Sequence, residues 1–455
     1  MRIPWARKPS PETNLWSIPA WRYSFPASII SRLGDVIFDL TIVLWIGTDL
    51  AAGESWAPAA VSGVLLAAAV PILVAGPIAG VTADRHDRHR IMVVSNGVQA
   101  VAISTLVFLP FLERHVGIGL TLAWIYAAIL VSNAAGQFFN QGRLAMIAKT
   151  VPEEQRTSAF SAQGAANSLI ALVGPPLAAP LLYSVGASWA LGINALSFVV
   201  SSFLLRFARW DSRPEPSAEK ESFTESLRGG VRAIVSNKML LAITVAITAV
   251  TLASGAISVL EVFFIEQVLR VDPAMLGVMS MAFALGTLLG VAVAPRLEHR
   301  IDAAILFAGG LVAMGFLVVV YSRLVDFWPA LVVFFAAAIP LGIVNTVLTP
   351  LAIRTIPADY LGRATVTLNV FPAISSLLAM ACTGWLVSTV LQGLDVEALG
   401  THFGPVDTVF LVGGLVMTVT GLAVARPLAR SRSSRPAEPD EPDVALGGPE
   451  VAETV

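Results

Sequence analysis

The sequence has few charged residues and a single cysteine. Only 13% of its 455 residues are Asp, Glu, Lys or Arg, whereas soluble domains carry roughly 25%. One cysteine, Cys382, excludes an internal disulfide and a metal site built from several cysteines. The formal net charge of −2 gives no basis for a nucleic-acid or acidic partner. Hydrophobic residues make up 56% of the chain and the mean hydropathy is +0.75, which indicates a membrane protein.

Motifs of common catalytic and metal sites are also absent from the sequence. No HExxH, GxSxG or GxxxxGK[ST] pattern occurs. The five histidines fall in or beside predicted loops: His86, His89, His115, His299 and His402. We therefore expect no enzyme, no bound metal and no cofactor. Without a phosphate-binding loop, energy is expected to come from an ion gradient, most simply a proton gradient.

Long apolar runs dominate the chain. About 20 apolar residues are enough to cross a bilayer as a helix, and twelve runs meet this length. They lie near residues 24–48, 58–83, 91–112, 118–147, 158–184, 187–208, 239–266, 274–294, 302–322, 328–353, 365–391 and 405–425. The N-terminus lacks the apolar region and cleavage site of a signal peptide, so we expect the first run to stay in the mature protein. The predicted fold class is an all-α membrane protein with twelve transmembrane helices.

Positive charge is distributed unequally between the two sides of these spans. Twelve spans place both termini on the same side. That side holds all of the 29 Lys and Arg residues except Arg114, Arg270 and Arg323. Because basic residues accumulate in cytoplasmic loops, the sequence predicts that both termini are cytoplasmic.

The longest inner connection separates six spans from six. We assign residues 1–22 to a cytoplasmic N-terminal segment, 23–208 to a first six-helix bundle, 209–238 to a linker, 239–425 to a second bundle and 426–455 to a disordered tail rich in Pro and acidic residues. In the linker, Phe223, Leu227, Val231 and Ile234 recur at helical spacing. This pattern predicts a short amphipathic helix that either lies on the inner membrane surface or packs against the bundle.

The two bundles share sequence patterns. "NQGRLAMIAKTVP" from Asn140 and "NTVLTPLAIRTIP" from Asn345 each run from an Asn through a basic residue to T-[VI]-P over the same length. "GVTADRHDRHR" from Gly80 has a fainter partner in "GVAVAPRLEHR" from Gly290. Six spans repeated in the same orientation are typical of one transporter architecture, with a substrate site between the halves near the bilayer midplane.

Four stretches of the sequence resemble known family motifs. The stretch from Gly80 resembles the inner-loop signature of the major facilitator superfamily (MFS), G-x-x-x-D-[RK]-x-x-[RK]-[RK], and lies between spans two and three as in that family. "GPPLAA", from Gly174 and Pro175, resembles a degenerate form of the span-five motif of proton-coupled antiporters. The "VPEEQ" and "LGR" loops are similar to those of the drug and siderophore exporter branch, which includes macrolide and enterobactin exporters. The resemblance reaches to about residue 425 and implies two six-helix bundles.

The charged stretch between spans two and three suits an inner gate. We predict that Gly80 and Asp84 belong to this gate and that Asp84 accepts hydrogen bonds from backbone N–H groups opening span eleven, near Arg363. Arg85 and Arg88 are expected to pair with carboxylates when the inner side is closed, since such bonds form in one state and break in the other. The simpler alternative is that the arginines only set topology.

Acidic residues occur inside the spans. Asp35 and Asp39 are four residues apart in the first span and share a helix face with Arg32. A charge near the middle of a span costs roughly 2.5–3.5 kcal/mol on insertion scales, so this face is expected to point into the bundle. Two nearby carboxylates in a poorly solvated cavity do not both ionise readily. We predict that this pair, together with Glu261 of span seven, binds a proton or a cationic substrate. The alternatives are a structural Arg32–Asp35 pair and a water-exposed Glu261.

Uncharged polar residues within the apolar runs are predicted to line a cavity. They are Gln99, Asn133, Gln137, Asn140, Asn167 and Asn345. Arg143, near the inner end of span four, is expected to pair with a carboxylate. The alternative for any single Asn is a hydrogen-bonding contact between helices.

These features favour a transporter of the bacterial plasma membrane that exports an amphiphilic small molecule in exchange for protons. Because one chain holds both bundles, we expect a monomer. A lysophospholipid or siderophore transporter of the same fold is the alternative, and a nutrient importer is a further one. A head-group-sized polar cavity with a lateral opening would favour the lipid.

Overall fold

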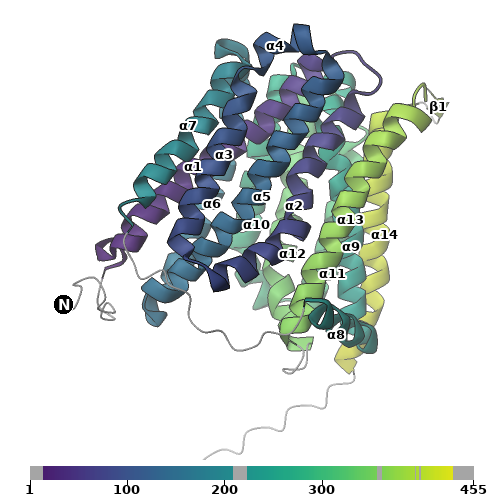
Figure 1. Ribbon diagram of the computed structural model, residues 1–455. Helices are drawn as coiled ribbons and strands as arrows, with labels where there is room; N and C mark the ends of the chain where they lie inside the picture. Colours follow the sequence, from purple (N-terminus) through teal and green to yellow (C-terminus); the bar gives the residue numbers. More distant parts are fainter. Residues whose placement is uncertain (1–13, 209–222, 356–360, 395, 399–400, 434–455) are drawn as a thin grey trace, which may run out of the picture.

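The computed structural model describes residues 14–208, 223–355, 361–394, 396–398 and 401–433. Within these ranges it is almost entirely helical, and twelve long helices cross it in two groups (Figure 1). The first group comprises α1 (Pro19–Trp45), α2 (Ala57–Arg85), α3 (Arg88–Val107), α5 (Ile118–Thr150), α6 (Glu153–Val185) and α7 (Ala187–Leu205). The second comprises α9 (Lys238–Phe263), α10 (Leu276–Glu298), α11 (Ala303–Tyr321), α12 (Phe327–Thr355), α13 (Leu361–Trp385) and α14 (Pro405–Ser433).

Each long helix corresponds to one predicted span, which confirms the predicted fold class. Eleven stretches are long and apolar enough to cross a membrane. The exception is α1, which is long enough but is interrupted by Arg32, Asp35 and Asp39. A helical chain is what a bilayer requires, because every backbone N–H and C=O must be satisfied internally.

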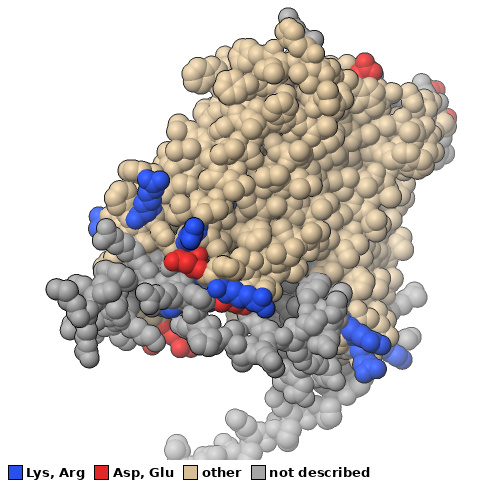
Figure 2. Space-filling view, in the orientation of Figure 1, with Lys and Arg blue, Asp and Glu red and all other residues tan. Residues whose placement is uncertain are grey.

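Basic residues gather at one end of the molecule. Figure 2 shows Lys and Arg near the end where α8 (Phe223–Ser236) lies, while the middle of this face carries neither sign of charge. We call this end the inner side and the opposite end the outer side. The predicted cytoplasmic placement of the termini stays a prediction.

Several short elements at the outer side differ from the sequence prediction. The third apolar run was expected to reach residue 112, and the candidate span does run from Arg88 to Leu112. It is not one continuous helix: α3 ends at Val107 and α4 (Leu109–Val116) follows, since Pro110 has no N–H to continue the ladder. A small hairpin, β1 (Val396–Ala398) and β2 (Thr401–Phe403), interrupts the last outer loop. Single π-helical turns end three spans, at Ile46–Leu50, Phe264–Val268 and Leu386–Val390.

Two segments at the inner side also needed the structure to define them. The helix predicted in the linker is present as α8 and packs against α13 and α9. Its Ile234 is only 4% exposed and lies against Leu240 and Leu368, so packing against the bundle accounts for this residue. The last helix continues to Ser433, beyond the start of the predicted disordered tail. Ala and Arg in this extension are good helix formers.

Packing between the two halves is concentrated at the outer side. One buried apolar cluster includes residues of both halves, among them Phe38, Trp45, Phe263 and Phe410. The other described clusters each lie within a single half. The described structure is therefore closed at the outer side, while its halves do not share a core at the inner side.

Small residues allow the halves to approach closely. A Cβ added at Gly277 of α10 would lie 2.6 Å from the carbonyl oxygen of Pro175 in α6. Between α2 and the outer part of α13, Ser62 donates a hydrogen bond to the carbonyl oxygen of Met380. The backbone N–H of Ala59 donates to Ser388 Oγ at 3.2 Å. These contacts close the outer side.

Substitution of Gly277 by valine should destabilise this outer-closed conformation. The new side chain collides with backbone atoms of α6, and overpacking of this kind costs about 1–3 kcal/mol. Thermal unfolding of the purified protein should show a lower Tm for Gly277→Val than for wild type.

The matched control is Gly192→Val in α7, because a Cβ at Gly192 meets nothing within 4 Å. A Tm for Gly277→Val that equals that of the control would show that the approach of α6 to α10 is not a close backbone contact.

Candidate substrate and coupling site

The first helix carries three charged residues on one side within the membrane span. Arg32 and Asp39 are exposed and Asp35 is half-buried. Arg32 interacts electrostatically with both carboxyl groups. Gly34 allows α1 to lie directly against Asn194 and Ser197 of α7, which sets the rotation of the charged face. Because charges facing lipid are costly, we infer that this face opens to the space between α1 and α5.

Asn194 is a component of this site that the sequence reading missed. It is 1% exposed and lies beside the Asp35 carboxyl. Its Oδ1 accepts a hydrogen bond from Ser197 Oγ at 3.2 Å. The signal that was available is an Asn within an apolar run, "LGINALSF".

Arg143 of α5 lies toward the same charges. It is half-buried, and it is close enough to Arg32 for the two guanidinium groups to repel each other. The sequence predicted a carboxylate partner, but the hydrogen bond that it makes is from Nη2 to Asn140 Oδ1, at 3.4 Å. Its buried Nε has no partner. The reason for the difference is that Asp35 and Asp39 lie farther along α1, beyond salt-bridge distance in this conformation.

No ion pair joins Arg32 or Arg143 to Asp35 or Asp39 in the part of the chain that the structure describes, whereas Arg323 and Asp407 do form one, at 2.7 Å. The alternative of a structural Arg32–Asp35 salt bridge is therefore not what this conformation contains. Arg32 interacts electrostatically with Asp35 and with Asp39, yet it forms a salt bridge with neither.

The predicted polar lining residues divide into helix contacts and exposed groups. Ser28 of α1 donates to Gln163, which in turn donates to Asn167 at 3.4 Å, so this chain links α1 to α6. Asn133 donates to the carbonyl oxygen of its own helix at Ile129. Gln99 is buried, Gln137 is half-buried, and Asn140 and Asn345 are exposed. A cavity-lining role for these residues stays a prediction.

Glu261 lies in α9 within the apolar part of the second half. Its Oε1 is buried and makes no hydrogen bond in the described structure. The phenol of Tyr321, on α11, interacts with it electrostatically and also has a buried oxygen without a partner. Tyr321 is 1% exposed and stacks on Phe264 at 4.6 Å. Glu261 as a whole is half-buried, and the alternative of a water-exposed Glu261 stays a prediction.

The inner loop after α2 is built around helix caps. Asp87 Oδ1 accepts from the backbone N–H of Arg90 at 3.0 Å and so caps α3. Arg88 donates from Nε to the carbonyl oxygen of Ala83 at 3.1 Å, which satisfies a group at the end of α2. Sequence reasoning assigned Arg88 only to gating or topology, so this local role is new.

The remaining gate residues are placed as follows. Asp84 is half-buried and Arg85 is exposed at the end of α2. A Cβ at Gly80 would meet nothing within 4 Å, so close packing does not require glycine there in this conformation. Arg363 lies in α13, but its side chain is outside the described residues, and the predicted contact with Asp84 stays a prediction.

The Gly-Pro motif lies where α6 meets both halves. A Cβ at Gly174 would approach Val36 of α1 at 2.7 Å, and the carbonyl of Pro175 approaches Gly277 of α10. The motif thus couples the charged helix to the second half through direct packing.

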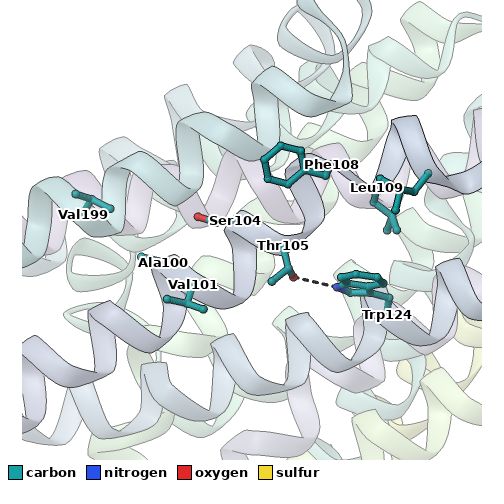
Figure 3. A pocket seen from close by; sticks show the side chains of 9 residues that line it. Ala100, Val101, Ser104, Thr105, Phe108, Leu109, Trp124 and Val199 are labelled. Carbon is teal, nitrogen blue, oxygen red and sulfur yellow. Dashed lines mark hydrogen bonds between the residues drawn. The ribbon is translucent and has the colours of Figure 1, made fainter.

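An apolar pocket of about 510 Å³ lies away from these charges. Figure 3 shows it between α3, the start of α4, α5 and α7, with the Trp124 indole donating to Thr105 Oγ1 at 3.0 Å. None of the predicted site residues lines it.

Comparison with known proteins identifies the family. Residues 24–380 match the Major Facilitator Superfamily. The chain belongs to this superfamily. It is thus a multi-pass membrane transporter and not an enzyme.

Relatives with similar sequences cover most of the chain. YfiS of Bacillus subtilis strain 168, an uncharacterised MFS-type transporter, is 24% identical, over 89% of this chain and 92% of YfiS. Macrolide efflux protein A of Streptococcus pyogenes is 24% identical, over 84% of this chain and 91% of its own. The putative bacilysin exporter BacE of Bacillus subtilis is 27% identical over shorter segments, 40% of this chain and 43% of BacE.

Solved structures of this superfamily share the fold. A bacterial homologue of the iron transporter ferroportin, in an inward-facing state, gives a TM-score of 0.70 at 15% identity and covers 93% of this chain and 100% of its own. A bacterial homologue of the lysosomal transporter Spinster, also inward-facing, gives 0.63 at 14% identity over 91% and 98%.

The unpartnered Glu261 carboxyl predicts that its neutral isostere will not destabilise the protein. Burying an unsatisfied polar group costs about 1–3 kcal/mol, and more when the group is charged, so Glu261→Gln should have a Tm equal to or above that of wild type. Thermal unfolding in detergent measures this.

Glu266→Gln, at an exposed position five residues farther along the same span, is the control. A clear fall in Tm for Glu261→Gln alone would mean that the carboxylate has a stabilising partner and is not available to bind a proton.

Proposed function

We propose that the chain is a secondary active transporter that exports an amphiphilic small molecule in exchange for protons across the bacterial plasma membrane. The observation that carries this proposal is the pair Asp35 and Asp39, which stand inside a membrane span with no ion-pair partner in the described structure. An antiporter needs a carboxyl group that binds either a proton or the substrate, and this pair supplies one.

The conformation supports export from the inner side. Because the outer ends are packed together, we expect the charged face of α1 to be reached from the inner side. Substrate binds there while Asp35 or Asp39 gives up a proton. Rearrangement of the halves then exposes the site outward, where protonation releases the substrate, as alternating access requires.

Two named relatives support an export direction. Macrolide efflux protein A and the putative bacilysin exporter are exporters by name, and the "VPEEQ" and "LGR" loops resemble those of the drug and siderophore exporter branch. One chain contains both halves, so we propose a monomer without a cofactor. A lysophospholipid or siderophore transporter of the same fold is the second candidate, because the first helix and Arg143 offer charges of both signs to a head group.

Accumulation assays test the proposal. A pump-deficient bacterium expressing the wild-type chain should accumulate less of at least one compound from a panel that includes a macrolide, bacilysin and a lysophospholipid. Asp39→Asn should reduce net efflux about tenfold or more. A tenfold lower rate corresponds to an activation free energy that is about 1.4 kcal/mol higher. A protonophore should have the same effect on wild type.

Asp49→Asn is the matched control, because Asp49 is exposed in the π-helical turn at the outer end of the same helix. Efflux that persists with a protonophore and in Asp39→Asn would contradict proton coupling through this pair. If only the lysophospholipid moves, the lipid transporter replaces the drug exporter.

A further inference from the structure

Helices α1 and α5 together carry two guanidinium groups and two carboxyl groups that are linked by electrostatic interactions through Arg32. Arg32 extends from α1 and Arg143 from α5, and they are near enough to repel each other. Like charges held together in a membrane span are costly unless an anion or a carboxylate separates them. The described structure places no carboxylate in direct contact with either one.

Arg143 in particular has unused hydrogen-bonding capacity. A guanidinium group has five N–H donors arranged to bind planar or tetrahedral anions. The contact that Arg143 makes is a long one, 3.4 Å from Nη2 to Asn140 Oδ1. Its Nε is buried and unpartnered. Leaving a buried donor unsatisfied is costly, and a bound anion would satisfy it.

The two signs of charge are ordered along the helix axis. Arg32 precedes Asp35 by one turn and Asp39 by two, and at 1.5 Å per residue Arg32 and Asp39 are separated by about 10 Å. Arg143 is close to the inner end of α5, seven residues before Thr150. The guanidinium groups therefore lie toward the inner side and Asp39 lies deeper.

The formal charges of Arg32, Arg143, Asp35 and Asp39 sum to zero. Such a site gives no net attraction to a simple cation or a simple anion. It favours a ligand with both charges, a cationic group near Asp39 and an anionic group near the arginines. Protonation of one carboxyl makes the site positive and weakens its hold on the cationic group, which suits release.

We propose that the substrate is a zwitterionic amphiphile whose anionic group binds Arg32 and Arg143 and whose cationic group binds Asp35 and Asp39. This inference deepens the proposed function and rests on it for the direction and energy of transport. Binding of the proposed zwitterion does not require that transport be coupled to protons.

Binding of three matched amphiphiles tests the head-group assignment. The probes are dodecyl sulfobetaine, dodecyltrimethylammonium and dodecanesulfonate, titrated below their micelle-forming concentrations into the full chain in lipid nanodiscs, with empty discs subtracted. Calorimetry gives Kd for each. We expect the sulfobetaine to bind about tenfold or more tightly than either singly charged probe.

Variants separate the two ends of the site. Arg143→Gln should weaken the sulfobetaine about tenfold and leave dodecyltrimethylammonium unchanged or tighter, because one repelling charge is gone. Asp39→Asn should weaken the sulfobetaine and the ammonium probe but not the sulfonate. Arg32→Gln is the second arginine variant, since Arg32 is exposed and makes no ion pair in the described structure, so its loss does not threaten folding.

Arg22→Gln is the control for removing a positive charge from α1. Arg22 is exposed near the inner start of the helix and lies over the Tyr23 ring at 5.8 Å. Its variant should bind all three probes as wild type does. A fourth probe carries the sulfobetaine head group with a methyl group in place of the dodecyl chain. If it binds as tightly as dodecyl sulfobetaine, the ligand is a soluble zwitterion and not an amphiphile.

The proposal would be overturned if wild type bound dodecyltrimethylammonium as tightly as the sulfobetaine, or more tightly. It would also be overturned if each arginine variant changed the affinity for all three probes by the same factor. This failure differs from failure of the proposed function. Proton-dependent efflux of a cation with no preference for the sulfobetaine would refute the zwitterion alone. Selective sulfobetaine binding without proton-dependent efflux would refute the coupling alone.

Discussion

A charged side chain has no water to solvate it in the hydrocarbon core of a bilayer, and the organisation of this transporter follows from that constraint. Its twelve long helices satisfy their own backbone groups and present apolar surfaces to lipid. Charges that do enter a span, such as Arg32, Asp35 and Asp39 on α1, are expected to face a space that the protein itself encloses. Packing of Gly34 against α7 and of Gly174 against α1 holds that face in place. The place of the proposed binding site thus follows from where charge can be tolerated.

The two ends of the molecule are held by different interactions. At the outer side, small residues and a shared apolar cluster bring the halves together, with the hydrogen bond from Ser62 to the carbonyl of Met380 among the few polar contacts. Apolar and small-residue contacts can separate without leaving charges exposed. At the inner side the halves have separate cores, and the loop after α2 carries the charges. A closed outer side belongs to one of the two end states of an alternating-access cycle.

The two halves also differ in the polar and charged side chains that they carry within the membrane. The first half places acidic and basic groups together with Asn194, so it can hold a polar ligand. The second half contains an isolated carboxyl, Glu261, beside the Tyr321 phenol in an aromatic cluster. A protonated carboxyl is the form that such an apolar environment tolerates best. The two halves therefore present different polar groups although they share a sequence repeat.

The sequence by itself determined the number and approximate positions of the membrane-spanning helices. Hydropathy over about 20 residues is a local property of the chain, and it decides whether a segment can cross the bilayer. Spacing alone also placed Asp35 and Asp39 on one face. Only the tertiary structure decided what those charges meet: Arg143 faces Arg32 instead of a carboxylate, and Glu261 lies beside Tyr321. These pairs come from helices far apart in the chain, and their proximity depends on helix rotation and close packing across the bundle. No local pattern in the sequence contains that information, since the position of each side chain is set by the neighbours of its helix.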